Sequence, residues 1–298
     1  MDFQPSRVQR DLRAGVRDLL AGRYGREALR ASVEAGVAVD RRLWRELGDA
    51  GFFALRLPEA EGGVGLGLAE AVVVFEEAGR ALLPGPLVAT FLAAGVVPGA
   101  ATGTTVVTAY DLEGPLVAHL GEADAVLGAP EPPGGEPVRS VDPLTPLHRV
   151  TRPGRAGRYR DEGALLTAAL QLGSALRTVE LAADHARGRE QFGQPIGAFQ
   201  AVKHLCAGML VRAEVARVAV YAAAVTGDGA EIAAAKLLAD EAAVRGARDC
   251  LQVYGGMGFT WEADVHLHLK RAWVRAEQWR TAARAEELLA ADLLGSSA

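Results

Sequence analysis

The chain has 298 residues, of which 50% are hydrophobic and 23% charged, and its formal net charge at pH 7 is −5. At about 150 residues per domain, this length suggests two domains, and the apolar content can bury sizeable cores, which excludes a largely disordered chain. Uncharged runs are broken by Pro or Gly before they reach the ~20 residues that span a bilayer. A mildly acidic chain also lacks the basic field that attracts nucleic acid or an anionic membrane, so we expect neither as a partner.

The two cysteines, Cys206 and Cys250, lie in Ala-rich stretches of helical pattern, and the sequence has no CxxC pair. No charged and then apolar leader precedes a cleavage-like site. A disulfide-rich secreted chain would use cysteine differently. The sequence therefore predicts a protein of the reducing cytoplasm.

Residues 1–100 are predicted to form a helical domain. Apolar residues recur every three or four positions over 8–20 and again over 33–47, which is the pattern of amphipathic helices. The stretch 51–67 contains five glycines and a proline and is expected to be a loop. A further helix is predicted over 70–83, where following prolines end it.

Residues 101–160 are predicted to form a truncated β domain. Short runs rich in Thr and Val, separated by turn residues, indicate strands; they are 104–110, 115–120, 124–127 and 148–151. Seven of the 14 prolines lie between Pro130 and Pro153, so no helix is expected there. The segment is long enough for a few strands but not for a large sheet.

Residues 161–298 are predicted to form a four-helix up-down bundle. The long Ala-rich patterns predict helices over 162–187, 197–226, 229–254 and 264–293. Short glycine-containing turns separate them. The predicted fold class is therefore mainly α, with a helical N-terminal domain, a small β middle domain and a C-terminal bundle.

Several common sites are not supported by the motifs. The glycine clusters at 63–67 and 255–258 lack the GxGxxG spacing and a preceding strand, and no GxxxxGK[ST] sequence is present. His266 and His268, near Asp264, are two positions apart on a predicted helix and so point to different faces, which argues against a metal site. No GxSxG sequence indicates a hydrolytic serine.

Two turns between the predicted long helices are more informative. The first turn has two interpretations. Either Arg189 ends a helix, where a cation is favourable for structural reasons alone. Or its guanidinium fork binds a phosphate, while Phe192 and Gln200 hold a ring or ribose. In the second, Gly255 and Gly256 act as a helix C-cap, or they let backbone amides approach a pyrophosphate. Neither turn decides between these interpretations by itself.

Taken together, the sequences RxxFGxPIxxFQ from residue 189 and QxxGGxGF from residue 252 resemble the acyl-CoA dehydrogenase family. An N-terminal block is similar to the same family; it comprises Trp44, Leu47, Gly51, LPE at 57–59, GGxG at 62–65, EExGR at 76–80 and PxP at 84–86. The resemblance covers the chain except for about residues 100–160.

In that family, subunits of helical, β and four-helix domains form a homotetramer that binds FAD across a dimer interface. The isoalloxazine lies against one subunit's β domain and its catalytic glutamate, whereas the ADP half reaches the neighbouring subunit. The resemblance implies that this chain supplies the residues that receive the ADP half. They are Arg189, Phe192, Gly193, Gln200, Gln252, Gly255 and Gly256.

The features that a subunit needs for its own active site are missing. The T-E-P-x-x-G-S-D and W-I-T-N type segments that face the flavin ring are absent. The usual position of the catalytic base corresponds to Trp279, which cannot take a proton. The alternative base position corresponds to Gly163, and the arginine that usually follows it to Ala164. Lys270-Arg271-Ala272 stands where the family generally has Arg, then Asp or Glu, then Ala.

Two nearby carboxylates are weak substitutes for the base. Glu277 lies about 200° around the helix from Trp279. Glu162 is next to the alternative position, but an acidic residue in a first helical turn is explained by the helix dipole. We therefore expect no catalytic residue here, with Glu162 as the remaining candidate.

These losses favour one hypothesis: a reduced, non-catalytic subunit of a heteromeric acyl-CoA dehydrogenase, such as a heterotetramer. A full-length partner would supply the base and bind most of the acyl-CoA, FAD would be shared across the interface, and electron-transfer flavoprotein would accept the electrons. By resemblance, the pathway would be lipid or steroid catabolism. The alternatives are an active homomer that uses Glu162 and a flavin-free scaffold subunit.

Overall fold

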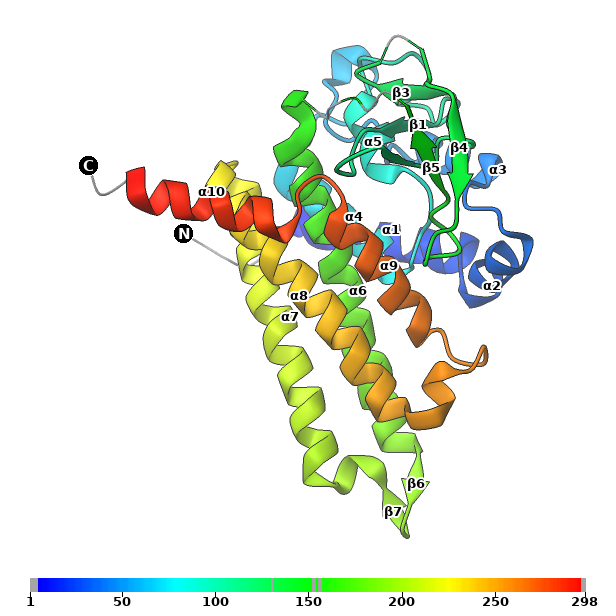
Figure 1. Cartoon of the computed structure of the whole chain (residues 1–298), viewed down its shortest axis with the longest axis vertical. Coiled ribbons are helices and arrows are strands. Elements are labelled where there is room, and N and C mark those ends of the chain that lie inside the picture. Colours follow the sequence, from blue (N-terminus) through cyan, green and yellow to red (C-terminus); the bar gives the residue numbers. More distant parts are fainter. Residues whose placement is uncertain (1–4, 130, 152–153, 155–156, 296–298) are drawn as a thin grey trace.

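The computed structural model describes residues 5–129, 131–151, 154 and 157–295. Helices dominate, and a small β region lies beside one end of a long helical bundle (Figure 1). This architecture confirms the predicted mainly α fold. The division into domains at residues 100 and 160 remains a prediction. None of the helices in the described part of the chain is long and apolar enough to cross a membrane.

The N-terminal region contains more helices than the sequence pattern predicted. They are α1 (Arg7–Arg23), α2 (Arg26–Ala35), α3 (Arg41–Asp49), the short 3-10 helix η1 (Glu59–Glu61), α4 (Leu68–Arg80) and α5 (Leu87–Ala93). The stripe over 33–47 belongs to two helices, because Gly36 ends α2 with φ +64° and the Asp40 side chain caps the start of α3. The pattern also missed α5, which begins directly after Pro86.

The β region consists of two small sheets. Strands β1 (Val107–Ala109) and β3 (Ala125–Leu127) pair in parallel, and an antiparallel sheet has the order β2 (Leu116–Ala118), β5 (Leu147–Val150), β4 (Gly135–Val138). Each of the four predicted runs overlaps one strand, and β5 begins one residue before its predicted run. The sequence missed β4 because it lies in the proline-rich segment; Pro137 is tolerated there because β4 is an edge strand.

The bundle is built from α6 (Arg160–Gly188), α7 (Gln200–Thr226), α8 (Gly229–Tyr254) and α9 (Val265–Glu277), and α10 (Ala282–Gly295) follows. The first three predicted helices agree with α6, α7 and α8 to within a few residues. The predicted fourth helix is wrong in its extent, because it is broken after Glu277 and α10 leaves the bundle at a steep angle (Figure 1).

A buried lysine explains this break. Lys236 of α8 is 1% exposed, and its Nζ donates to the backbone carbonyls of Arg275 (3.0 Å) and Ala276 (3.4 Å). Carbonyls in the last turn of a helix lack the usual acceptor bond from four residues on, and the Arg275 carbonyl here also accepts from the Gln278 N–H at 3.2 Å. The lysine also forms an ion pair with Asp240, one turn along α8. Further on, Trp279 has φ +62°, a conformation that a helix cannot contain.

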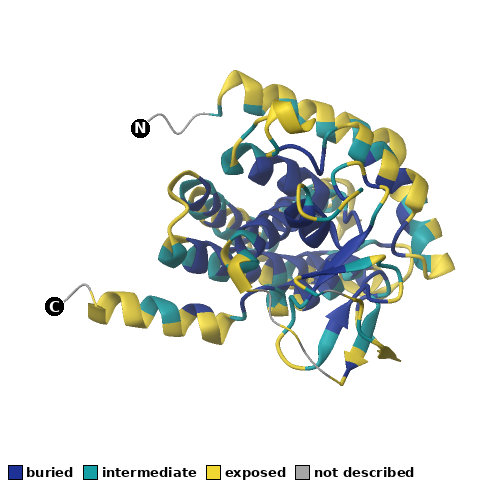
Figure 2. Cartoon of the chain, turned by 90° about the horizontal axis from the view of Figure 1, so that it is seen from above, coloured by how far each residue is buried: buried dark blue, intermediate teal, exposed yellow. Residues whose placement is uncertain are grey.

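The N-terminal region and the bundle are joined by very close helix packing. A Cβ atom added to Gly173 of α6 would lie 1.8 Å from the carbonyl oxygen of Glu76 in α4, and one added to Gly79 would lie 2.1 Å from that of Leu170. Only glycine permits this approach. Seen from above, buried residues run continuously through the central helices, whereas α1 and α10 are largely exposed (Figure 2).

A second buried ion pair connects α9 to the β region. Arg271 (4% exposed) donates from Nε to Asp142 (1% exposed), and its Nη1 lies 3.3 Å from the Leu82 carbonyl and 3.4 Å from that of Leu83. Asp142 also accepts from the Thr145 hydroxyl. Arg271 occupies the position at which the family generally has an acid, so here the arginine is on α9 and the carboxylate on the β region.

Asp142→Ala is expected to lower the free energy of unfolding by about 3–5 kcal/mol, because it leaves Arg271 buried without its partner. Asp184→Ala is the matched control: its pair with Arg187 is exposed on both sides, and its loss should cost less than about 1 kcal/mol. Urea denaturation of the three proteins measures both values. Equal losses in the two variants would contradict the importance of the buried pair.

Candidate functional site

The first predicted nucleotide-binding turn is a tight β-hairpin rather than a simple helix connection. Strands β6 (Glu190–Gln191) and β7 (Gln194–Pro195) pair antiparallel after α6. Phe192 and Gly193 are the two turn residues, with φ of +55° and +77°. Positive φ at both central residues is typical of the tight turn that joins twisted strands. The hairpin holds the Phe192 side chain out in solvent, 92% exposed.

The second turn lies at the same end of the bundle. It is a 3-10 segment, η4 (Gly255–Phe259), directly after α8. Gly255 has φ +59° and ψ −140°, a conformation open in practice only to glycine. The rings of His185 and Tyr254 stack 4.0 Å apart and so connect the end of α6 to the end of α8. Figure 1 shows the hairpin and η4 together at this tip.

The seven residues predicted to bind the ADP half are all exposed at this tip. Among the described residues, the side chains of Arg189, Gln200 and Gln252 have no hydrogen bond or ion pair within the chain. Burial and the nearby charge of Arg189 lower the pKa of His185. Large exposed side chains of Phe259 and Trp261 adjoin the site. The tip therefore presents polar groups that have no hydrogen bond or ion pair among the described residues, next to exposed aromatic rings. Phe192 meets Phe199 edge to face, and Trp261 contacts His266.

The two family positions for a catalytic base are in contact with each other at the other end of α6. Trp279 is 5% exposed, and its indole packs on Gly163 so closely that a Cβ atom there would lie 2.2 Å from the ring. The backbone N–H of Trp279 donates to the Asp111 carbonyl, which fixes the residue against the β region. The indole thus fills the space beside the alternative base position.

Neither substitute carboxylate lies free beside this indole. Glu162 forms an ion pair with Arg56 at 2.6 Å and lines a separate pocket of about 200 Å³ together with Phe53 and Tyr159. Glu277 is the exposed last residue of α9.

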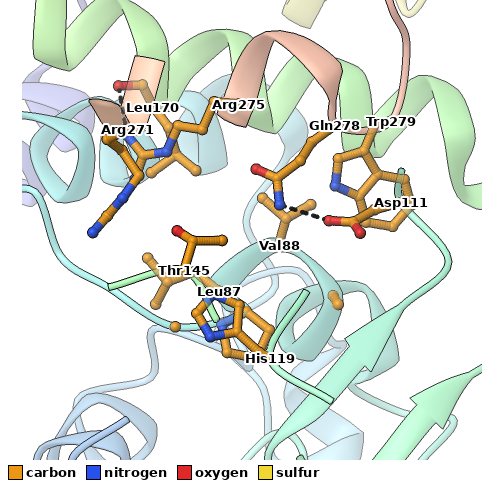
Figure 3. Close-up of a pocket in the computed structure, with 13 residues that line it drawn as sticks. Leu87, Val88, Asp111, His119, Thr145, Leu170, Arg271, Arg275, Gln278 and Trp279 are labelled. Carbon is orange, nitrogen blue, oxygen red and sulfur yellow. Dashed lines mark hydrogen bonds between the residues drawn. The ribbon is translucent and has the colours of Figure 1, made fainter. Parts of the chain in front are cut away.

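Sequence reasoning missed one carboxylate, Asp111, which lies between β1 and β2. Its Oδ2 accepts a 2.8 Å hydrogen bond from Gln278, and its buried Oδ1 has no partner among the described residues. Burial raises the pKa of this carboxyl to about 7, and the Gln278 hydrogen bond only partly opposes that effect. Figure 3 shows Asp111 beside Gln278 and Trp279 on the wall of a small pocket. No motif marked this residue, because its surroundings come from distant segments.

Of the other residues considered in the sequence, His268 and Asp264 have polar partners, whereas neither ring nitrogen of His266 has one among the described residues. His268 is buried and its Nδ1 lies 2.8 Å from the Ser174 hydroxyl. Asp264 pairs with Arg26 and Arg30 of α2. Within the described part of the chain, no group of three or more His, Cys, Asp or Glu side chains could hold a metal ion.

The helical regions on both sides of the β region match models of a single protein family. Residues 6–106 match the acyl-CoA dehydrogenase N-terminal domain and residues 160–284 match the acyl-CoA dehydrogenase C-terminal domain. These two matches cover more than half of the 298 residues. The chain therefore belongs to the acyl-CoA dehydrogenase family, which confirms the resemblance carried by its motifs.

Individual relatives agree with this assignment. Acyl-CoA dehydrogenase IpdE2 of Mycobacterium tuberculosis is 36% identical over 295 residues, which cover 90% of this chain and 92% of the relative. Acyl-CoA dehydrogenase FadE34 of the same organism is 34% identical over 307 residues, which cover 87% of this chain but 42% of the relative. Among solved structures, a chain of the ChsE4-ChsE5 complex from M. tuberculosis aligns over 99% of both chains with 25% identity and a TM-score of 0.86.

Gly163→Ala is expected to lower the free energy of unfolding by about 1–3 kcal/mol, because the added methyl group overlaps the Trp279 ring. In a Trp279→Ala background the same substitution should cost less, since the ring is gone. Gly15→Ala is the control: nothing lies within 4 Å of its Cβ position in α1, so it should not destabilise the chain. Chemical denaturation of the four variants gives the coupling. Additive effects of Gly163→Ala and Trp279→Ala would contradict the contact.

The raised pKa of Asp111 predicts a pH-dependent stability. Between about pH 4 and 7 the folded chain retains a proton on this carboxyl that the unfolded chain has lost, so this group lowers the free energy of unfolding as the pH rises. Asp111→Asn removes the titration. Relative to the parent chain, the variant should become more stable between pH 5 and pH 8, by at most about 3 kcal/mol. Urea denaturation at both pH values measures this; a difference independent of pH would refute it.

Proposed function

We propose that this chain is the non-catalytic subunit of a heteromeric FAD-dependent acyl-CoA dehydrogenase. In this proposal it binds the ADP part of an FAD whose reactive ring is held by a partner subunit. The observation that carries the proposal is an asymmetry between the two ends of α6. Exposed polar side chains that have no hydrogen bond or ion pair among the described residues gather with exposed aromatic rings at the hairpin end, whereas Trp279 fills the space beside Gly163 at the other end.

The residues at the tip fit the ADP half of FAD chemically. The Arg189 guanidinium suits a phosphate, because its planar fork can donate two parallel hydrogen bonds to it. The exposed Phe192 ring offers a flat apolar surface for adenine or ribose. No atom lies within 4 Å of a Cβ position on Gly256, so its backbone is open to a ligand. Gly193, Gln200, Gln252 and Gly255 complete the proposed set.

The chemical step is assigned to the partner. Tryptophan has only a donor N–H and cannot remove the α-proton. In the proposed complex, a carboxylate of the partner would take that proton, and FAD would supply the acceptor for the β-hydrogen as hydride, so that the acyl-CoA would become a trans-2-enoyl thioester. This chain's own contribution is to hold the nucleotide end and to form the subunit contact.

An exposed apolar stripe on α7 supports assembly with other subunits. Val211, Val215, Val218 and Val225 are between 49% and 68% exposed and recur at three, four and seven positions, which places them along one side of the helix. Contiguous apolar faces of this kind mark interaction surfaces. They fit the heterotetramer that we propose.

The relatives support both the partner and the type of substrate. ChsE4-ChsE5 is a complex of two named chains, and Tcur3481-Tcur3483 is described as a steroid acyl-CoA dehydrogenase, with 25% identity and a TM-score of 0.83 to this chain. We infer a bulky, steroid-like acyl-CoA as substrate and electron-transfer flavoprotein as the electron acceptor. Cys206 and Cys250 are both free thiols, consistent with the cytoplasm as the proposed compartment.

The test is to co-express the chain with the product of the adjacent reading frame and to determine subunit ratio and flavin content of the purified complex. We expect FAD in the complex and little or none on the chain purified by itself. If the isolated chain is yellow and reduces an artificial acceptor in the presence of an acyl-CoA, it is an active homomer, with Glu162 as the first residue to substitute.

Arg189→Ala in the complex should weaken FAD binding about 10-fold or more, since it removes a charge-assisted hydrogen bond to phosphate. Arg187→Ala is the matched control, because this exposed arginine of the same helix end is paired with Asp184. Flavin retained after gel filtration measures the effect. Retention that is equal in both variants would instead favour a scaffold subunit that takes no part in binding FAD.

A further inference from the structure

Arg275 of α9 is a buried cation without a counter-charge. It is 3% exposed, and no carboxylate of the described residues lies within ion-pair distance of its guanidinium. Its one hydrogen bond runs from Nη1 to the Leu170 carbonyl at 3.4 Å, which is long. A guanidinium stays charged in proteins. Such a group is strongly unfavourable in an interior unless an anion neutralises it.

A second buried arginine makes the charge of Arg275 still less favourable. Arg271, one turn earlier on α9, is buried beside it, and burial together with the charge of Arg271 lowers the pKa of Arg275. Among the described residues, the acid whose charge acts on both arginines is Asp142, which already accepts from Arg271, from the Thr145 hydroxyl and from the Leu144 N–H. Two buried cations therefore share one carboxylate whose oxygens are occupied.

Arg275 lines a small pocket. The pocket has a volume of about 30 Å³ and lies between α9, the start of α5 and the β region (Figure 3). Thr145, Gln278, His119 and Asp111 contribute polar atoms, with the Asp111 carboxyl beside Gln278 and Trp279, and Leu87 and Val88 form an apolar wall. The planar guanidinium fork is matched by a carboxylate, which can accept two parallel hydrogen bonds.

We propose that Arg275 and this pocket form a binding site for a small carboxylate. The carboxylate, either a free anion or the end of a longer molecule, neutralises Arg275 and fixes the end of α9 next to Trp279. This site is independent of the proposed function, because it lies within one chain and far along α9 from the hairpin tip (Figure 1).

Thermal unfolding of the full chain tests the proposal with acetate as the probe, exchanged for chloride at constant ionic strength. We expect a saturable rise in Tm; at an acetate concentration ten times Kd, the ratio of folded to unfolded chain should increase about 11-fold. Arg275→Gln should abolish the response. The control Arg245→Gln, at an exposed arginine paired with Glu241 on α8, should retain it.

Arg275→Gln is expected to fold, because it removes a buried unpaired charge, and its Tm without acetate should equal or exceed that of the parent. Arg275→Lys keeps the charge but loses the fork, so it should bind acetate more weakly. A comparison of glutaryl-CoA with butyryl-CoA shows whether the carboxylate belongs to a longer molecule. If glutaryl-CoA, whose acyl group ends in a carboxylate, raises Tm and butyryl-CoA does not, the site binds the end of an acyl chain. The proposal is overturned if neither acetate nor glutaryl-CoA stabilises the parent chain, or if Arg275→Gln responds like the parent.

Discussion

The ammonium group of Lys236 lies inside the bundle, bonded to Asp240 and to two carbonyls at the end of α9. The lysine caps the helix end, where the Arg275 carbonyl also accepts from the Gln278 N–H, and α9 does not continue beyond this point. The turn carries Gln278 to the Asp111 carboxyl and buries Trp279 against Gly163. The packing of Trp279 on Gly163 thus depends on a contact between Lys236 and Ala276, which are 40 residues apart in the sequence.

The opposite end of the bundle, with the β6–β7 hairpin and η4, exposes its polar side chains. Stacking of His185 on Tyr254 and the tight hairpin at Phe192 hold the backbone rigidly, yet the side chains that project from it have few partners in the chain. Rigid backbone with unsatisfied side chains is what a preorganised binding surface requires, since less conformational entropy is lost when a ligand or a neighbouring subunit arrives. The same fold therefore separates an exposed surface, whose polar side chains have few partners among the described residues, from an interior in which Trp279 packs against Gly163.

Charge is distributed unusually in the interior next to α9. An arginine stands at residue 271, where the family generally has an acid, and its partner Asp142 lies across the boundary on the β region. The contact between α9 and the β region is therefore ionic, and Arg271 adds positive charge next to Arg275. The result is a local excess of one buried cation, in a pocket whose walls come from α5, the β region, α6 and the end of α9.

The sequence by itself determined the long helices, four of the five strands in the β region and the family, because apolar periodicity and the glycine-containing motifs are local properties. It also indicated that Trp279 and Gly163 cannot act as bases, since this follows from residue type. Only the tertiary structure decided that these two residues touch, that residues 278–281 break the last predicted helix, and that Asp111 and Arg275 share a pocket. Those facts depend on burial and on contacts between residues far apart in the chain, such as Lys236 with Ala276, for which local patterns carry no signal.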